Sequence, residues 1–208
     1  MIVLIFGDSI TQGYWDTAGG WADRIKASVF RKDIDANFAH YHGVHNLGID
    51  GNTTSQVIER FDNEVKARLW PGSEYGVIFA IGTNDTVTRE VGGPLSSPEQ
   101  YKQELAVLLN KARGLTSNIA FVNLCPVDEA LTNPLSASSS GKCYTNQQID
   151  SFNSSLSEFC RQNDVSLIDV HGPFGKRDDL LADGLHPNSA GHEIIYQAVQ
   201  EQLNKWLP

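Results

Sequence analysis

The sequence predicts an α/β protein with a three-layer α/β/α sandwich around a five-stranded parallel sheet. Short apolar runs alternate along the 208 residues with longer segments whose apolar residues recur at helical spacing. Most of the runs are apolar over five to seven consecutive residues, as expected of strands that helices bury on both faces. This alternating order is typical of a parallel sheet with right-handed crossovers.

Five segments are the predicted strands, and four of them are largely apolar. The first runs directly into Gly7-Asp8-Ser9. The second is weaker, because only Phe38, His40 and His42 alternate with smaller or polar residues. The predicted strands cover residues 2–6, 37–47, 75–81, 119–124 and 165–170.

Five helical patterns complete the alternation. Ser97 is the predicted N-cap of the third helix, with Pro98 at its first position, and Asn188 or Ser189 caps the last. Pro71-Gly72 is a stop signal for the second. The predicted helices cover residues 20–30, 54–70, 98–113, 144–162 and 189–207. In such folds the chemistry lies at the carboxyl ends of the strands.

Length and charge limit the classes of function. A chain of 208 residues has the size of one α/β domain, so we expect a single domain over residues 1–208. The net charge is −9 and no basic stripe is present, which argues against nucleic-acid partners and against an anionic membrane surface. No segment has the length of a membrane span. The sequence gives no indication of oligomeric state.

Cysteine content and the N-terminus bear on the compartment. Cys125, Cys143 and Cys160 are odd in number and widely spaced, which favours reduced thiols over a disulfide framework or a zinc site. A single Cys125–Cys143 bridge stays open. The apolar start lacks a basic region and reads as a buried strand rather than a signal peptide, so we expect a cytoplasmic location. A chain trimmed of its leader would look the same.

Three residues that follow strands have the types needed for nucleophilic catalysis. Ser9 comes directly after the first strand, and a serine needs a base to become a nucleophile. His186 is the candidate base, and Asp183, three residues upstream, is the candidate partner that orients it. Each motif has a structural alternative: a turn that ends a strand for Ser9, and a helix-cap turn or a solvated pair for the other two.

Acyl transfer also needs donors for the oxyanion of the tetrahedral intermediate. Gly48 offers a backbone N–H after the second strand, and Asn84 offers a side-chain amide after the third. The backbone N–H of Ser9 is a third candidate. The alternatives are a turn glycine at positive φ for Gly48 and an Asx-turn for Asn84. We expect Asp8 and Asp85 to support the turns rather than to take part in chemistry.

Four blocks of the chain together resemble the SGNH hydrolase superfamily, also called the GDSL lipase/esterase family. Each block is weak alone, but all four occur in the family's order, each after a predicted strand. Ile10 stands where the name-giving Leu is found. The blocks are Gly7-Asp8-Ser9-Ile10-Thr11, Asn46-Leu47-Gly48-Ile49-Asp50-Gly51-Asn52-Thr53, Gly82-Thr83-Asn84-Asp85 and Asp183-Gly184-Leu185-His186-Pro187-Asn188.

The resemblance implies roles for the residues already singled out. It implies Ser9 as nucleophile, His186 as base and later acid, and Asp183 as the residue that orients His186. It also implies the Ser9 and Gly48 N–H groups and the Asn84 side chain as oxyanion donors. The implied fold is flavodoxin-like, with no metal and no cofactor.

Candidate pocket residues flank these motifs. Tyr14 and Trp15 follow the nucleophile turn and could contact the substrate, whereas Trp21 is equally well placed to be a core residue. The segment 128–143 is rich in Ser, Pro and Asn near its centre and suits a mobile wall or lid, or a plain surface loop. Val127, Asp128 and Leu131 are the pocket candidates near it.

The remaining histidines carry no functional prediction. His40, His42 and His45 have a spacing that can bind a metal, with His40 and His42 on one face of a strand. We expect strand and turn histidines instead, because no cysteine or carboxylate is placed in sequence to complete the site. His171 and His192 have the same structural interpretation. No Gly-rich phosphate-binding motif is present, so no nucleotide is expected.

The leading functional hypothesis is a serine esterase that acts on small soluble acyl esters. A thioesterase, a lysophospholipase or a carbohydrate acetylesterase would use the same site. An acyltransferase that excludes water is an alternative from another class, and a non-catalytic binding module with a relic site is a third.

Overall fold

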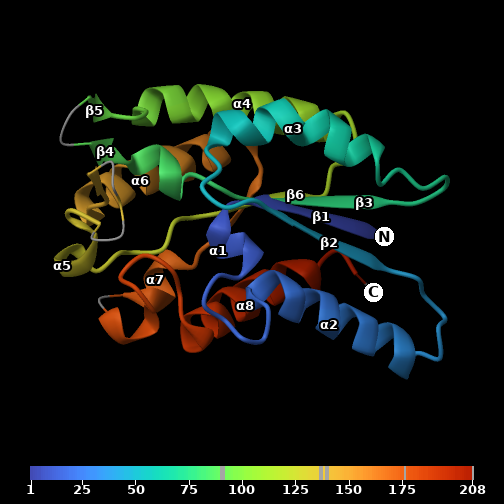
Figure 1. Ribbon diagram of the computed structural model, residues 1–208. Coiled ribbons are helices and arrows are strands. Elements are labelled where there is room, and N and C mark those ends of the chain that lie inside the picture. Colours follow the sequence, from blue (N-terminus) through green and yellow to red (C-terminus); the bar gives the residue numbers. More distant parts are fainter. Residues whose placement is uncertain (90–91, 136–137, 139–140, 176, 208) are drawn as a thin grey trace.

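The main sheet of the computed structural model has five parallel strands in the order β2-β1-β3-β6-β8 (Figure 1). The structure describes residues 1–89, 92–135, 138, 141–175 and 177–207. The strands are β1 (Ile2–Gly7), β2 (Gly43–Gly48), β3 (Tyr75–Ala80), β6 (Ile119–Val122) and β8 (Ser166–Ile168). The predicted five-stranded parallel sheet is therefore confirmed.

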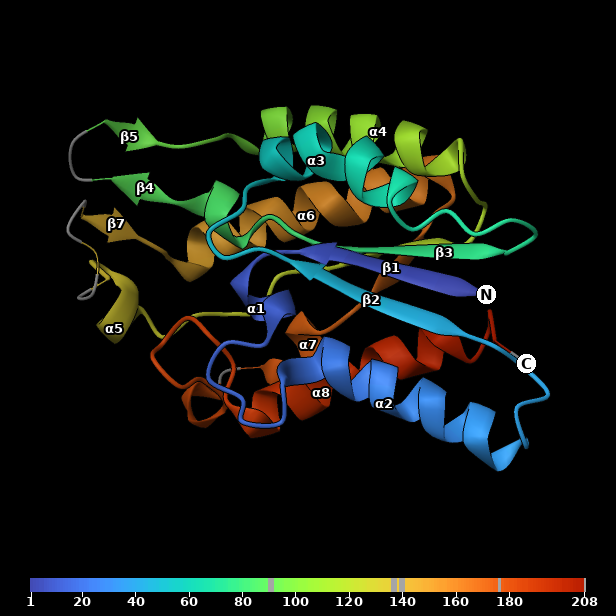
Figure 2. The same ribbon diagram turned by 45° about the vertical axis from the view of Figure 1, so that its right-hand side comes forward.

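Helices cover both faces of this sheet, as Figures 1 and 2 show. One face carries α3 (Thr54–Lys66), α4 (Pro98–Arg113) and α6 (Asn146–Asn163). The other carries α2 (Gly20–Asp35) and α8 (Ser189–Leu203). Alternate residues of β1 therefore enter different cores, Leu4 and Phe6 on the first side and Val3 and Ile5 on the second. Burial on both faces explains why the strand is continuously apolar.

Helix boundaries follow the capping signals where these are strong. The Ser97 hydroxyl accepts from the N–H of Gln100 at 3.1 Å, and α4 has its predicted bounds. Asn188 caps α8 by accepting from the N–H groups of Ala190 and Gly191. The structure shortens the second predicted helix, since α3 ends at Lys66, and lengthens the first, since α2 continues to Asp35.

Several short elements were not predicted, and most of them gather where the strands end. In Figure 2, α1, α5 and the small sheet β5-β4-β7 lie beyond the tips of the strand arrows. Elements of two to four residues are too short to show a sequence period. They are α1 (Ser9–Gln12), α5 (Glu129–Thr132), α7 (His171–Phe174), β4 (Thr88–Arg89), β5 (Gly93–Pro94), β7 (Lys142–Cys143), and the 3₁₀ turns η1 (Thr83–Thr86) and η2 (Asp178–Leu180).

The start of the second strand was predicted wrongly. β2 begins at Gly43, so Phe38, His40 and His42 precede it instead of sharing its faces. Asn37 and Phe38 adopt left-handed backbone conformations, with φ of 51° and 60°, and the Phe38 side chain is 73% exposed. The alternation in this segment therefore reflects a connection that leaves α2, not a half-buried strand.

A carboxylate does lie beside these histidines, contrary to the sequence expectation. Asp33 in α2 contacts the His42 ring and accepts from the His42 N–H at 2.9 Å. The contact was missed because Asp33 is brought near by the turn between α2 and β2. Within the part of the chain that the structure describes, no group of three or more His, Cys, Asp and Glu side chains is placed to hold a metal ion.

The cysteines and the helices bear on two further expectations. Cys125, Cys143 and Cys160 are free thiols, and the bridge left open between the first two is not formed. Among the described residues, no helix is both long enough and apolar enough to cross a membrane.

Candidate active site

The structure brings Ser9, His186 and Asp183 together at the carboxyl end of the sheet. Ser9 Oγ lies 2.9 Å from His186 Nε2, although the two residues are 177 positions apart. On the other side of the ring, His186 Nδ1 lies 2.8 Å from Asp183 Oδ2. A ring that donates from Nδ1 has its Nε2 lone pair free to accept the serine proton.

The turn that presents Ser9 is built around Asp8. The Asp8 carboxylate accepts from the N–H of Ile10 at 2.9 Å and caps α1, as expected of a supporting residue. Burial raises the pKa of Asp8 to about 6, against the lowering effect of that bond and of His186. Gly13 closes the turn in a left-handed conformation, with its N–H donating to the Ser9 carbonyl.

The loop that carries His186 folds around the carboxylate of Asp183. Asp183 Oδ1 accepts from the N–H groups of Leu185 and His186 at 3.0 and 2.8 Å. Burial would raise the pKa of Asp183, but the hydrogen bonds from the His186 ring and backbone outweigh it and hold the pKa well below its usual range. Asp183 is therefore an anion at any pH at which the protein would work.

Gly48 is a glycine because of close packing, not because of a positive φ. A Cβ at this position would lie 2.4 Å from the backbone nitrogen of Gln12 and 2.7 Å from the carbonyl oxygen of Asp8. The end of β2 is thus pressed against the nucleophile turn. The Gly48 N–H donates to Asn46 Oδ1 at 3.0 Å, so this expected oxyanion donor already has an acceptor within its own strand.

Asn84 is held by two partners distant in sequence rather than by its own turn. Its Nδ2 donates to the carbonyl of Asn52 at 3.1 Å, and its Oδ1 accepts from the Tyr144 hydroxyl at 3.1 Å. These two bonds fix which end of the amide is the donor. One N–H of Nδ2 is used by Asn52, so the second is available for an oxyanion.

Asp85, the neighbour of Asn84, supports the same region. Its carboxylate accepts from the N–H of Thr54 at the start of α3, with both oxygens within 3.2 Å. Burial raises the pKa of Asp85 to about 7, although the Thr54 bond opposes this. Asp85 therefore ties the Asn84 turn to α3, in keeping with its expected supporting role.

Sequence reasoning missed Tyr144 and Arg60. Tyr144 was taken only as the start of a helix, yet its hydroxyl orients Asn84. Arg60 Nη2 donates to the carbonyls of Gly7 and Leu47 at 3.1 and 2.7 Å and so joins the ends of β1 and β2. No motif marks either residue, because both act through contacts made only in the folded chain.

The pocket candidates beside the first block lie against the two proposed catalytic loops. The Tyr14 ring stacks on the His186 ring, with centroids 5.6 Å apart, and Trp15 Nε1 donates to Asp183 Oδ2 at 2.7 Å. Trp21 is fully buried beneath them, which confirms it as a core residue. Tyr14 and Trp15 are thus neighbours of His186 and Asp183.

The candidates of the segment 128–143 differ in exposure. Val127 is buried in the core, whereas Leu131 is exposed and lies against Gly184, whose φ is +87°. Asp128 caps α5 and its N–H donates to the Gly184 carbonyl at 2.8 Å, so the segment is attached to the His186 loop. Residues 136–137 and 139–140 of the segment fall outside the described residues.

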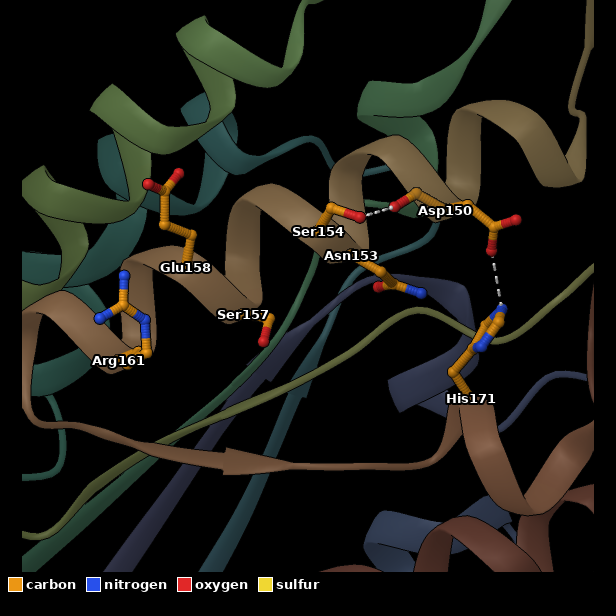
Figure 3. A pocket seen from close by; sticks show the side chains of 7 residues that line it. All are labelled: Asp150, Asn153, Ser154, Ser157, Glu158, Arg161 and His171. Atoms are coloured by element: carbon orange, nitrogen blue, oxygen red, sulfur yellow. Dashed lines mark hydrogen bonds and ion pairs between the residues drawn. The ribbon is translucent and has the colours of Figure 1, made fainter.

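A second set of Ser, His and Asp side chains lines a shallow hollow beside α6, shown in Figure 3. His171 Nε2 lies 3.3 Å from Asp150 Oδ1, while Ser154 Oγ donates to the Asp150 backbone carbonyl at 2.8 Å. The serine here is bonded to its own helix and not to the imidazole. Of these two sets, only the first places a serine hydroxyl within hydrogen-bond distance of an imidazole, a contact that acyl transfer requires.

The remaining histidine, His192, has a structural position. It is fully buried in α8, where Nδ1 accepts from the N–H of Trp21 at 3.3 Å and Nε2 lies 3.2 Å from the Tyr14 carbonyl oxygen. Burial is the main cause that lowers its pKa, so the ring stays neutral and donates from Nε2.

The chain resembles known proteins in sequence and in fold. The chain is 24% identical to the GDSL esterase/lipase WDL1 of Oryza sativa subsp. japonica over 221 residues, covering 100% of this chain and 80% of that protein. A lipase/acylhydrolase from Enterococcus faecalis has the same fold, with a TM-score of 0.77 and 21% identity over 100% of this chain and 97% of that one. Axe2, an acetylxylan esterase from Geobacillus stearothermophilus, matches with a TM-score of 0.72 and 19% identity over 97% and 93%.

The family assignment rests on a match along most of the chain. The family described as GDSL-like Lipase/Acylhydrolase matches residues 5–194, which include all four sequence blocks. The chain therefore belongs to the GDSL-like lipase/acylhydrolase family and is a carboxylic ester hydrolase.

Proposed function

We propose that the protein is a serine esterase in which Ser9, His186 and Asp183 form the catalytic triad. The observation that carries the proposal is the hydrogen-bonded series from Ser9 Oγ through the His186 ring to the Asp183 carboxylate, with both links under 3 Å. The base is oriented by an anion and touches the nucleophile, which is the arrangement that activates a serine.

Acylation follows from these contacts. Ser9 Oγ attacks the acyl carbonyl carbon as its proton passes to His186 Nε2, and the carbonyl π pair moves onto oxygen. The imidazolium then protonates the leaving alkoxide as the bond between the acyl carbon and that oxygen breaks. Asp183 stabilises the imidazolium and keeps the ring in place. In deacylation His186 takes a proton from water, hydroxide adds to the acyl-enzyme, and Ser9 leaves with the proton returned.

The oxyanion would be held by donors from three strand ends. The Ser9 N–H lies at the start of α1, and Asn84 retains one amide N–H beyond the one given to Asn52. The Gly48 N–H would have to be shared with Asn46 Oδ1 or released from it as the oxyanion forms. Asn84 is therefore the side-chain donor that is best prepared in the substrate-free protein.

The surroundings favour small soluble esters and transfer to water. Asp183 is an anion and Asp50 lies at the Tyr14 hydroxyl, so an anionic acyl or alcohol group would meet like charge. The side chains of His186 and Asp183 are 15% and 37% exposed, which leaves the base within reach of water.

We also keep the cytoplasm as the predicted location, because the three thiols are free.

The test compares Ser9→Ala with Ser154→Ala on p-nitrophenyl acetate. Removal of a nucleophile of this kind lowers kcat by about 10⁴–10⁶-fold. We expect that loss for Ser9→Ala and wild-type rates for Ser154→Ala, the serine of the Figure 3 hollow. Full activity in Ser9→Ala would exclude the proposed function.

A further inference from the structure

The carboxylate of Asp183 has one hydrogen-bond partner from a distant part of the chain. Its own loop supplies three donors, which are the backbone N–H groups of Leu185 and His186 and the His186 ring. The fourth donor is Trp15 Nε1, at 2.7 Å from Oδ2 and 168 residues away in sequence. A carboxylate has about four acceptor sites, so with the indole N–H all of them have a donor from the protein.

The backbone at Trp15 is held in a conformation that a bulky residue rarely adopts. Its φ is 64°, in the left-handed region that favours glycine, and its side chain is 60% exposed. Exposure gives the ring little burial energy to offset this strain. Strained residues of this kind cluster at functional sites, where the surrounding structure holds them in place.

The loop around Trp15 is anchored to both helices of the second face. The buried His192 ring joins the Tyr14 carbonyl to the N–H of Trp21. The next residue, Asp16, accepts from the Gly20 N–H at 3.2 Å and pairs with Arg24 at 2.6 Å. These contacts fix the chain on either side of Trp15. The Tyr14 ring also meets the indole edge to face, with centroids 5.6 Å apart, so the loop and this ring contact together aim the indole at Asp183.

We infer that Trp15 is a positioning residue, whose indole N–H fixes the Asp183 carboxylate and limits how strongly that carboxylate holds a proton on His186. The inference rests on the proposed function. Oδ2 accepts from both His186 Nδ1 and Trp15 Nε1, so the indole takes up part of the oxygen's negative charge. A carboxylate that is partly satisfied in this way stabilises the imidazolium less. Loss of the indole N–H should therefore let Asp183 hold the imidazolium more strongly.

Other groups also contact or face His186. The Tyr14 ring covers one side of the imidazole, and the Tyr14 hydroxyl reaches Asp50 at 3.4 Å. None of these contacts uses the indole N–H. The titratable groups that face His186 are Asp183 on its own loop, Asp8 in the turn after β1, His192 on α8, and Asp50 beyond Tyr14.

The experiment uses Trp15→Phe, which keeps an aromatic ring but removes the N–H. Profiles of kcat/KM against pH for p-nitrophenyl acetate should show the acidic limb of the variant moved upward by about 0.5–1 pH unit, as loss of one charge-assisted donor implies. kcat should fall several-fold and KM should change little. Trp70→Phe is the matched control, because Trp70 is 64% exposed and lies at the other end of the sheet, and its profile should coincide with that of the wild type.

A second measurement does not depend on catalysis. In ¹H–¹⁵N spectra of the wild type, the Trp15 indole N–H, assigned by its absence in Trp15→Phe, should be shifted downfield and protected from exchange. Asp183→Asn should reduce both the shift and the protection. The inference would be overturned if the acidic limb of the Trp15→Phe profile coincided with that of the wild type. It would also be overturned if the Trp15 indole signal were unchanged in Asp183→Asn. If Ser9→Ala kept full activity, the proposed function would fail instead, whatever the indole signal showed.

Discussion

Two sets of Ser, His and Asp side chains among the described residues differ in what the serine oxygen contacts. Ser9 begins a four-residue helix directly after a strand, and its Oγ faces His186. Ser154 lies inside the 18-residue α6, and its Oγ donates to the carbonyl four residues earlier (Figure 3).

The difference shows how local structure decides the reactivity of a serine. A serine within a long helix finds a backbone acceptor one turn away, which satisfies its proton. A serine at the start of a short helix after a strand has no preceding turn to bond, so its hydroxyl points out at the sheet edge and can meet a base. Substitutions around Ser9 should therefore lower activity more than substitutions elsewhere, including those in the Ser154 set.

The largest effect among these variants is expected at Asp183, and Asp150 is the comparison. Asp183→Asn removes the anion that holds His186 in the accepting tautomer, so kcat should fall by about 10⁴-fold. Asp150→Asn changes the carboxylate paired with His171 and should leave kcat unchanged. Steady-state kinetics on p-nitrophenyl acetate measures both. Equal losses in the two variants would mean that the hollow beside α6 contributes to catalysis.

The next effect is expected at Asn84, the proposed side-chain donor to the oxyanion. Asn84→Ala removes the amide N–H that is not used by Asn52, and loss of an oxyanion donor lowers kcat by about 10²–10³-fold. KM should stay within about twofold, because the interaction forms in the transition state. A variant with wild-type kcat would show that Asn84 only braces the turn.

A smaller effect is expected at Tyr144. Tyr144→Phe removes the hydroxyl that donates to Asn84 Oδ1, so the amide loses one of its two constraints. We expect kcat to fall by about tenfold, as for loss of one buried hydrogen bond of about 1.4 kcal/mol. Tyr41→Phe, at an exposed tyrosine, is the control. Unchanged kcat in Tyr144→Phe would mean that the Asn52 carbonyl alone orients the amide.

The smallest effect concerns stability, not turnover. Burial raises the pKa of Asp85 to about 7, so the native state holds this proton at pH values where the unfolded chain has lost it. The contribution to the free energy of unfolding is therefore full below about pH 4 and is lost as pH rises to about 7. In Asp85→Asn the fall in stability between pH 4.5 and 7 should shrink by on the order of 2 kcal/mol.

Urea denaturation at the two pH values measures this change. Asp150→Asn is the control. The Asp150 side chain is 62% exposed, so its substitution should not alter how the free energy of unfolding depends on pH. If the free energy of unfolding of Asp85→Asn changed between the two pH values as much as that of the wild type, Asp85 would titrate in the folded protein as it does in the unfolded chain.

Much of the fold was predictable because its signals are local. Strands buried on both faces appear in the sequence as apolar runs, and the start of α4 was marked by Ser97 and Pro98. The start of the second strand was predicted wrongly because Phe38, His40 and His42 alternate in polarity without belonging to the strand. The short elements at the sheet edge were not predicted, because their conformation depends on tertiary contacts rather than on a sequence period.

The candidate site was predictable to the level of its motifs. Parallel strands bring their carboxyl ends to one edge, so residues after strands were expected to meet, and Ser9, His186 and Asp183 do lie in contact. The neighbours that orient them were not predictable. Tyr144 and Trp15 reach Asn84 and Asp183 through side-chain directions that no spacing in the sequence encodes.

Covalent labelling tests the central claim most directly. The wild-type protein is treated with a fluorophosphonate probe, and the modified peptide is identified by mass spectrometry. We predict a single modification on Ser9, abolished in Ser9→Ala and slowed in Asp183→Asn, with Ser154 unmodified. Modification of Ser154, or hydrolysis of p-nitrophenyl acetate by protein in which Ser9 stays unlabelled at saturating probe, would contradict the account.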